Sequence, residues 1–196
     1  MHKDAGAPLG RVLEGCVDTI LSQVTLLRQI SSEFSSFASS PVARPAPTEI
    51  PAVIDEVTAP YRAGLPDSVR LVVESEDRLP LIHVDRGLLG RALVNVIENA
   101  LHAMRGGGTL TVRTSRVDGA VRIAVDDTGV GMDADALQHL FEPYFSTKAT
   151  GTGLGLTIAK RNVELNGGTI AVESAKGRGT RVTITLPAPP DGPASA

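Results

Sequence analysis

The sequence predicts an α+β fold in two layers: a mixed five-stranded sheet with about three helices, preceded by one long α-helix. Two observations support this. Segments that alternate apolar and polar residues come mostly in pairs joined by tight turns, and helical patterns separate them without a regular strand–helix–strand repeat. A proline-rich stretch then separates the first forty residues from the rest.

Composition excludes several classes of protein. The 196 residues suffice for one domain and an appendage, and 19 Lys+Arg against 22 Asp+Glu give a net charge of −3 without a basic tract, so no nucleic-acid partner is expected. Cys16 alone cannot form an internal disulfide or a cysteine zinc site. No apolar run approaches the roughly 20 residues that span a bilayer, and no signal peptide opens the chain. We therefore expect these residues to be cytoplasmic, with any membrane anchor of the parent protein outside them.

Residues 1–40 are predicted to contain one helix, over 9–38. Its apolar residues follow spacings of four, three, four, three and seven, a heptad seam made of Leu13, Val17, Ile20, Val24, Leu27 and Phe34. The seam can pack on the same domain or on a partner helix. Its length of about 45 Å at 1.5 Å per residue favours a homodimer. Residues 41–48 are predicted to form a proline-rich linker, and 188–196 a disordered tail.

The remaining elements follow from periodicity and from turn residues. Asp85 is a suitable N-cap, Asp118-Gly119 indicates a hairpin turn, and Gly167-Gly168 ends the last helix. The predicted helices cover 49–63, 86–104, 133–140 and 154–166, and the predicted strands 69–75, 109–116, 120–126, 169–175 and 180–186.

Three polar side chains line up on the helix predicted over 86–104. Asn95, Asn99 and His102 follow at i, i+4 and i+7, away from the apolar face. Asn is a poor residue inside a helix, so two in register indicate that their amides are used. An amide oxygen suits Mg²⁺. The alternative is an ordinary solvated face.

The strand predicted over 120–126 leads into Asp127. Alternation places this carboxylate at the end of a buried row, where it needs hydrogen-bond donors, and the exocyclic amine of a purine would supply one. Gly129 and Gly131 would let the backbone approach the base closely. The alternative is an ordinary Asp/Gly turn.

A glycine-rich loop precedes the last predicted helix. Gly151, Gly153 and Gly155 lead into a helix N-terminus, which presents free N–H groups to phosphates, and Lys148 lies just upstream. The spacing is neither a dinucleotide-binding fingerprint nor a Walker A motif. A loop without a ligand is the alternative. Three of the six aromatic residues precede it, at Phe141, Tyr144 and Phe145, either as core or as a latch for a mobile lid.

The order of these motifs is more specific than any one of them. Asn95-Val-Ile-Glu-Asn99, Asp127-Thr-Gly-Val-Gly131, the aromatic segment, the glycine loop and Gly177-Arg-Gly-Thr180 together resemble the ATP-binding domain of sensor histidine kinases. That domain belongs to the gyrase, Hsp90, histidine kinase and MutL ATPase superfamily. The resemblance covers 49–187 and implies a Bergerat-type ATP-binding fold. The short segment that ends in Ser146-Thr147-Lys148 looks like that of the nitrogen-regulation type of sensor kinase. Residues 1–40 look like the second helix of that type's dimerisation domain.

The resemblance also implies roles for residues. Asn99 would hold Mg²⁺, Asp127 would read adenine, and His102 would contact phosphate. Asn95 stands where hydrolysing relatives have a Glu that activates water, so slow hydrolysis is expected, and Lys148 would neutralise charge during phosphoryl transfer. The remaining contacts with ATP would come from Gly129, Gly131, Gly151, Thr152, Gly153, Leu154, Gly155 and Thr180.

A histidine kinase also needs a phosphoacceptor His, usually followed by Asp or Glu. His2, His83, His102 and His139 are followed by Lys, Val, Ala and Leu. We therefore expect a fragment that binds ATP and Mg²⁺ but receives its acceptor from a histidine-bearing dimerisation helix of the parent kinase, with a response regulator receiver domain as the later acceptor.

Two other functions share this fold. An anti-sigma-type serine kinase normally lacks the long upstream helix, and an ATP-driven clamp would need Glu at position 95 and a further domain.

Overall fold

The computed structural model describes residues 42–146 and 151–188 and, of the first forty, residues 10, 13–21, 23–24, 27–28 and 31. The chain divides into two compact units, Met1–Ser40 and Pro41–Ala196. Among the described residues, no helix is both long enough and apolar enough to cross a membrane.

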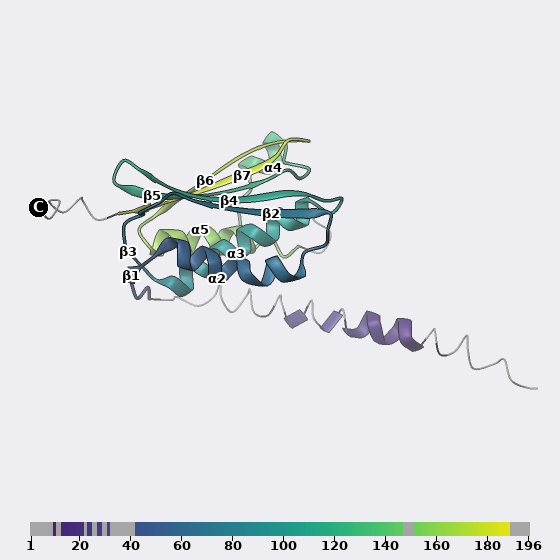
Figure 1. The fold of residues 1–196 in the computed structure, drawn as a ribbon. Coiled ribbons are helices and arrows are strands. Elements are labelled where there is room, and N and C mark those ends of the chain that lie inside the picture. Colours follow the sequence, from purple (N-terminus) through teal and green to yellow (C-terminus); the bar gives the residue numbers. More distant parts are fainter. Residues whose placement is uncertain are drawn as a thin grey trace, which may run out of the picture. The chain divides into compact units, whose positions relative to one another are not determined.

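The second unit is a two-layer α+β sandwich, as predicted. Its mixed sheet has the strand order β2-β4-β5-β7-β6, in which β2 and β4 are parallel and the other neighbours antiparallel. Three helices lie on one face of this sheet (Figure 1). The strands are β2 (Val69–Ser75), β4 (Gly108–Val117), β5 (Ala120–Asp127), β6 (Thr169–Ala175) and β7 (Gly179–Pro187), and the helices α2 (Ile50–Gly64), α3 (Arg86–Ala103) and α5 (Gly155–Leu165).

Local sequence signals account for the ends of these elements. The Asp85 carboxylate accepts a hydrogen bond from the Leu88 N–H at 3.0 Å and so caps α3. Backbone hydrogen bonds from Arg44 and Leu88 lower the pKa of Asp85. Asp118 and Gly119 both have positive φ, at 44° and 74°, which suits a two-residue hairpin between β4 and β5. The predicted N-cap of α3 and the predicted hairpin turn are therefore confirmed.

The core lies between the helices and the sheet. The predicted apolar face of α3 is at most 5% exposed and consists of Leu89, Leu93, Val96, Ala100 and Met104. It packs with apolar residues of β4, β5 and β7 and with α5. A short helix, α4 (Ala134–Gln138), follows β5 and is capped by Asp133.

The structure corrects the predicted linker. Residues 46–48 form β1 (Ala46–Thr48), which pairs antiparallel with β3 (Ile82–Val84), so only the part of 41–48 before Ala46 precedes the first strand. Pro47 is compatible with this position because a two-stranded sheet consists only of edges, where a missing N–H costs least. Neither strand was predicted from the sequence.

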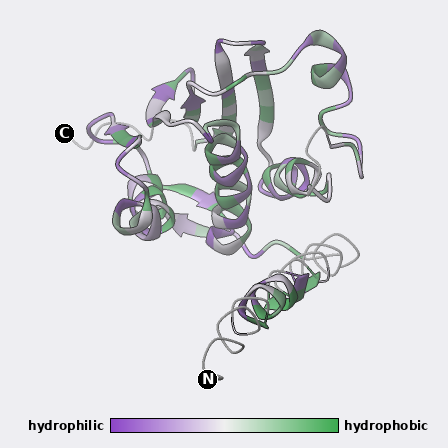
Figure 2. Cartoon of the chain, turned by 90° about the vertical axis from the view of Figure 1, so that its right-hand side faces the viewer, coloured by the Kyte–Doolittle hydropathy of each residue, from purple (hydrophilic) through white to green (hydrophobic). Residues whose placement is uncertain are grey.

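The described residues of the first unit are helical. The cartoon of this helix carries green, hydrophobic stretches in Figure 2. Its large apolar residues are 42–63% exposed: Leu13, Val17, Ile20, Leu21, Val24 and Leu27. The other residues of the helix predicted over 9–38, and the tail from 189 onward, lie outside the described part of the chain.

Candidate functional site

A row of polar residues closes one end of the sheet on the face that carries the helices. The inward residues of β5 are apolar and buried up to Val125, and the next one is Asp127, which is 9% exposed. Asp127 pairs in register with Thr180 of β7, and Thr180 pairs with Ser174 of β6. The predicted position of Asp127, at the end of a buried row, is confirmed.

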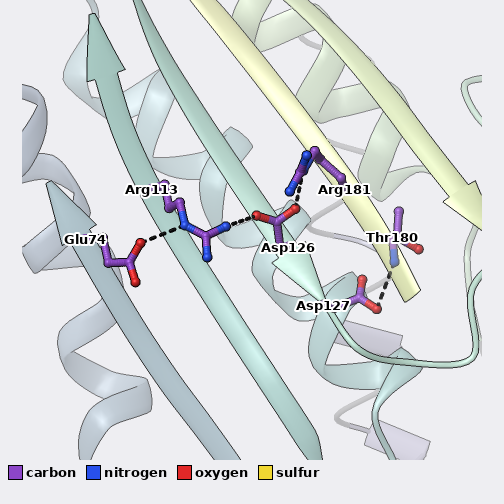
Figure 3. A network of polar contacts seen from close by, with 6 residues as sticks. All are labelled: Glu74, Arg113, Asp126, Asp127, Thr180 and Arg181. Carbon is purple, nitrogen blue, oxygen red and sulfur yellow. Dashed lines mark hydrogen bonds and ion pairs between the residues drawn. The ribbon is translucent and has the colours of Figure 1, made fainter. Parts of the chain in front are cut away.

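The Asp127 carboxylate is held by backbone donors. Its Oδ1 accepts the Gly129 N–H at 2.8 Å. The same oxygen accepts the Thr180 N–H at 3.3 Å, as Figure 3 shows. Because burial disfavours an ionised carboxylate, these donors help to keep it charged. They also fix the carboxylate relative to both β7 and the loop that follows β5.

The glycines of that loop lie against other backbone. A side chain at Gly129 would meet the Ala103 carbonyl oxygen at 2.7 Å, and one at Gly131, which has φ +63°, would overlap the Ala175 carbonyl. The Val130 carbonyl also accepts the Gly177 N–H at 2.7 Å. The glycines therefore fit the loop between the end of α3 and the β6–β7 hairpin, whereas the sequence suggested a close approach to a base.

The two amides of α3 lie beside the start of α5. Asn95 and Asn99 are half-buried, and a side chain at Gly155 would lie 3.6 Å from Asn99 Nδ2 and 4.0 Å from Asn95 Oδ1. Among the described residues, the structure shows no side-chain hydrogen bond that caps the N-terminus of α5 at Leu154. The structure thus brings together the amides, Gly155 and the N–H groups of the first turn of α5, where the helix dipole favours an anion. His102 is exposed on the last turn of α3.

The aromatic segment packs on the glycine loop. Gly153 has φ +71°, and a side chain there would lie 2.5 Å from the Tyr144 carbonyl carbon. The Thr157 hydroxyl of α5 donates to the Phe141 carbonyl at 3.1 Å. Gly151 and Thr152 were both predicted to contact ATP. Gly151 is exposed, and Thr152 is half-buried. The Thr152 Oγ1 accepts the Leu154 N–H. Lys148 lies outside the described residues.

His139 belongs to the same segment. Its Nδ1 lies 2.9 Å from Glu142 Oε1, and its ring centroid lies 5.4 Å from that of Phe145. The hydrogen bond to Glu142 is the main cause that raises the pKa of His139. The stabilisation from this pair is therefore complete below the unfolded-state pKa of His139 and is lost as the pH rises through its folded-state pKa.

We expect Glu142→Gln to lower the pKa of His139, because the variant removes the carboxylate that favours the imidazolium. An NMR titration of the imidazole resonances would measure this. Glu56→Gln is the matched control, since Glu56 pairs with Arg86 on the helices. Equal His139 pKa values in wild type and Glu142→Gln would contradict the assigned cause.

The opposite face of the sheet carries a charge ladder, defined here as Glu74, Arg113, Asp126, Arg181 and Glu173. Arg113 bonds Glu74 and Asp126, at 2.7 Å each, and Arg181 bonds the other oxygen of Asp126 (Figure 3). Asp126 raises the pKa of Arg181 through this bond, and Glu173 adds a smaller effect. The ladder has one charge on each of the five strands, with alternating sign.

We expect Asp126→Ala to lower the free energy of unfolding by about 1 kcal/mol, because it breaks two ion pairs of a network and leaves two arginines side by side. Asp55→Ala is the control, since the single pair of Asp55 with Arg62 is mostly exposed. Urea denaturation of both variants measures the difference. Equal losses would show that the ladder does not act as a network.

The site residues predicted from sequence thus fall into two groups. Asp127, Thr180, Gly129 and Gly131 lie at the end of the sheet, and Asn95, Asn99 and Gly155 lie where α3 meets α5. Ser174 was missed, although the alternation Ile170, Val172, Ser174 places a polar residue at the end of an inward row.

Several curated relatives of this chain are named as histidine kinases. Sensor histidine kinase ZraS of Klebsiella oxytoca is 44% identical over 121 residues, which are 61% of this chain and 26% of the relative. Nitrogen regulation protein NtrY of Azorhizobium caulinodans is 34% identical over 192 residues, which are 93% of this chain and 24% of the relative. The chain thus spans about a quarter of the length of these relatives.

Solved structures agree with these relatives. The mycobacterial sensor histidine kinase MprB superimposes with a TM-score of 0.66 at 30% identity, over 76% of this chain and all of that chain. Full-length ShkA in complex with AMPPNP gives a TM-score of 0.68 at 26% identity, over all of this chain and 42% of that chain. The relatives support the histidine kinase interpretation over the anti-sigma alternative. Residues 84–190 match the family described as histidine kinase-, DNA gyrase B- and HSP90-like ATPase, and the chain belongs to this family.

Proposed function

We propose that this chain is the ATP-binding catalytic region of a sensor histidine kinase, which transfers the γ-phosphoryl group of ATP to a His outside these residues. A response-regulator Asp would be the later acceptor. The observation that carries the proposal is the buried Asp127, held by two backbone N–H groups in a chain of this family. The name of the relative sensor histidine kinase ZraS supports it, as does a solved complex of histidine kinase ThkA with response regulator TrrA, which has the same fold.

The base would bind at the end of the sheet. The Asp127 carboxylate accepts hydrogen bonds only, so it would recognise the exocyclic amine of adenine. Gly129 and Gly131 keep the loop after β5 packed on α3 and on the hairpin, and the Thr180 N–H holds Asp127 Oδ1 from β7. The base would thus meet a carboxylate whose orientation is fixed before binding.

The phosphates would bind where α3 meets α5. The N–H groups from Gly151, Thr152, Gly153, Leu154 and Gly155 would surround them at the positive end of the α5 dipole. His102 and Lys148 would add side-chain donors. This places charge stabilisation around the transferred group, which is the main requirement of phosphoryl transfer.

The residues where α3 meets α5 suit a Mg²⁺ ion that is held by few protein ligands. Among the described residues, no group of three or more His, Cys, Asp or Glu side chains could hold a metal ion. The amide of Asn99 beside Gly155 is a hard oxygen ligand, and Mg²⁺ commonly takes one or two protein ligands with phosphates and water. When bound, Mg²⁺ would neutralise charge on the phosphates.

We expect Asn99→Ala to remove most of the Mg²⁺ dependence of ATP binding, because the variant deletes the proposed oxygen ligand. Calorimetric titrations of ATP with and without Mg²⁺ would show an affinity difference at least about tenfold smaller than in wild type. Gln138→Ala is the control, because Gln138 is an exposed amide side chain on α4. An unchanged Mg²⁺ dependence in Asn99→Ala would refute this role.

The side chains at the proposed phosphate site favour phosphoryl transfer to an imidazole over hydrolysis of ATP. The amide of Asn95 cannot act as a general base for water, so ATP would be kept for a stronger nucleophile. An imidazole nitrogen would attack the γ-phosphorus and form a phosphorus–nitrogen bond while the bond to the bridging oxygen of ADP breaks. Lys148 would neutralise the charge that develops on the transferred group.

Labelled ATP tests this proposal. The full chain alone should stay unlabelled, because none of its four histidines is followed by an acidic residue. Adding the dimerisation domain of the parent kinase should give an acid-labile phosphate on that domain. ATP binding without transfer would overturn the kinase proposal, and label on this chain would place the acceptor among its own residues.

Two further predictions concern the parent protein. A homodimer through residues 9–38 stays a prediction that the exposed apolar residues of the described helix support. The predicted cytoplasmic location also stays a prediction.

A further inference from the structure

The aromatic segment, residues 141–145, is joined to α5 by two contacts that meet on Phe141. The Thr157 hydroxyl donates to the Phe141 carbonyl at 3.1 Å. About one turn further along α5, the Lys160 ammonium lies 5.1 Å from the centroid of the Phe141 ring, a favourable distance for a cation on an aromatic face. Both the backbone and the ring of Phe141 are therefore held by this helix.

The residues after Phe141 form a turn whose backbone is unfavourable for its sequence. The Phe145 N–H donates to the Glu142 carbonyl at 3.3 Å, which closes a turn with Pro143 in its second place. Tyr144 occupies the third place with φ +66°, where glycine is usual because a side chain disfavours this conformation. Contacts outside the turn must offset this cost, and those of Phe141 with α5 lie directly before it.

The glycine loop packs on this turn, backbone against backbone. A β-carbon at Gly153 would lie 2.5 Å from the Tyr144 carbonyl carbon and 2.7 Å from the Phe145 nitrogen. Two residues later, α5 begins at Gly155, and Thr157 is its third residue. Thr157 thus belongs to the first turn of α5, whose N–H groups have no partner within the helix, and its hydroxyl holds the segment on which the loop rests.

We propose that Thr157 is a positioning residue for the triphosphate. Through Phe141 it keeps the aromatic turn against Gly153, so that the N–H groups of the glycine loop are oriented before ATP binds. This inference rests on the proposed binding of the phosphates where α3 meets α5. The hydroxyl proton is used by the Phe141 carbonyl, and the hydroxyl lone pairs repel a phosphate oxygen, so Thr157 acts on ATP through the segment.

A comparison of ATP with adenosine tests this role, because adenosine has the base and the ribose but no phosphates. Thr157→Val removes the hydroxyl and keeps a branched side chain of similar size. We expect it to weaken ATP about fivefold, as the loss of one hydrogen bond does, and to leave the affinity for adenosine unchanged. NMR titrations of the full chain measure both affinities, including weak ones. Thr157→Ser keeps the hydroxyl and should restore the affinity for ATP.

A matched control and a second measurement separate positioning from a general loss of stability. The Thr58 hydroxyl donates to the Ile54 carbonyl at 2.8 Å within α2, so Thr58→Val removes a similar bond elsewhere and should leave the ratio of the two affinities unchanged. Without nucleotide, hydrogen exchange of the Phe145 amide relative to the amides of β5 should be faster in Thr157→Val and unchanged in Thr58→Val. If Thr157→Val is unfolded at the assay temperature, Thr157→Ala replaces it, because alanine favours a helix.

The outcomes are distinct. If Thr157→Val weakens ATP and adenosine equally, or leaves ATP unchanged, Thr157 does not position the triphosphate and the inference is wrong. The inference also fails if Thr157→Ser does not restore binding, or if ATP is weakened while exchange of the Phe145 amide stays as in wild type. If wild type does not bind ATP, the proposed function itself fails.

Discussion

Asp127→Asn is expected to weaken ATP binding at least about a hundredfold. The amide oxygen can still accept the N–H groups of Gly129 and Thr180, so the loop and β7 keep their positions. The second oxygen becomes an NH₂ group, which would face the donating amine of adenine. Binding affinity falls far more when two hydrogen-bond donors are forced to face each other than when a single contact is only removed. Calorimetric titration with ATP would measure the loss.

Asp126→Asn is the matched control for this variant. Asp126 precedes Asp127 on the same strand but lies on the outer face, where its carboxylate bonds two arginines. This variant should change the affinity for ATP by less than about twofold, because the substitution is chemically identical and reaches no proposed ligand contact. Equal affinities of wild type and Asp127→Asn would refute the adenine assignment, whereas equal losses in both variants would indicate a general effect of charge.

The largest expected loss of stability is that of Gly179→Ala. Gly179 has φ +86°, which costs an L-residue about 1–2 kcal/mol, and a β-carbon there would overlap the Asp127 carbonyl oxygen. The strand would have to move away from β5, which adds a cost of the kind that overpacking gives. We expect the free energy of unfolding to fall by at least about 3 kcal/mol, measured by urea denaturation.

Gly177→Ala is the matched control, because it introduces backbone strain without a steric overlap. Gly177 has φ +76° in the same hairpin, and a β-carbon there would meet nothing within 4 Å. This variant should lose only the strain of about 1–2 kcal/mol. If the two variants were equally stable, the close approach of β7 to Asp127 would not limit position 179.

Much of the fold follows from local patterns. β2 and β6 occupy the residues predicted for them, because period-two alternation in a sheet with one buried face leaves little freedom of register. The end of α5 was predicted from a different local signal. Gly167 has φ +71°, a backbone conformation that glycine adopts easily and that commonly follows the last residues of a helix. Asp127 was placed correctly because it continues the buried row of β5.

Other features depend on contacts between distant segments. β1 and β3 have three residues each, too few to show a period, and they form only because 46–48 and 82–84 meet. The Ser174 hydroxyl meets the Met132 N–H and the Thr180 hydroxyl only in the folded chain, where residues far apart in sequence come together. The charge ladder likewise requires the order of all five strands. These contacts join residues that are far apart in the sequence, so local sequence patterns do not predict them.

The most direct test of the central claim is a crystal structure of this chain with a non-hydrolysable ATP analogue and Mg²⁺. The proposal predicts the exocyclic amine of adenine within about 3 Å of the Asp127 carboxylate, a usual hydrogen-bond distance. It also predicts Mg²⁺ on the Asn99 oxygen and the phosphates beside the first turn of α5. A nucleotide whose base lies away from Asp127, with its phosphates away from Gly155, would contradict the proposal.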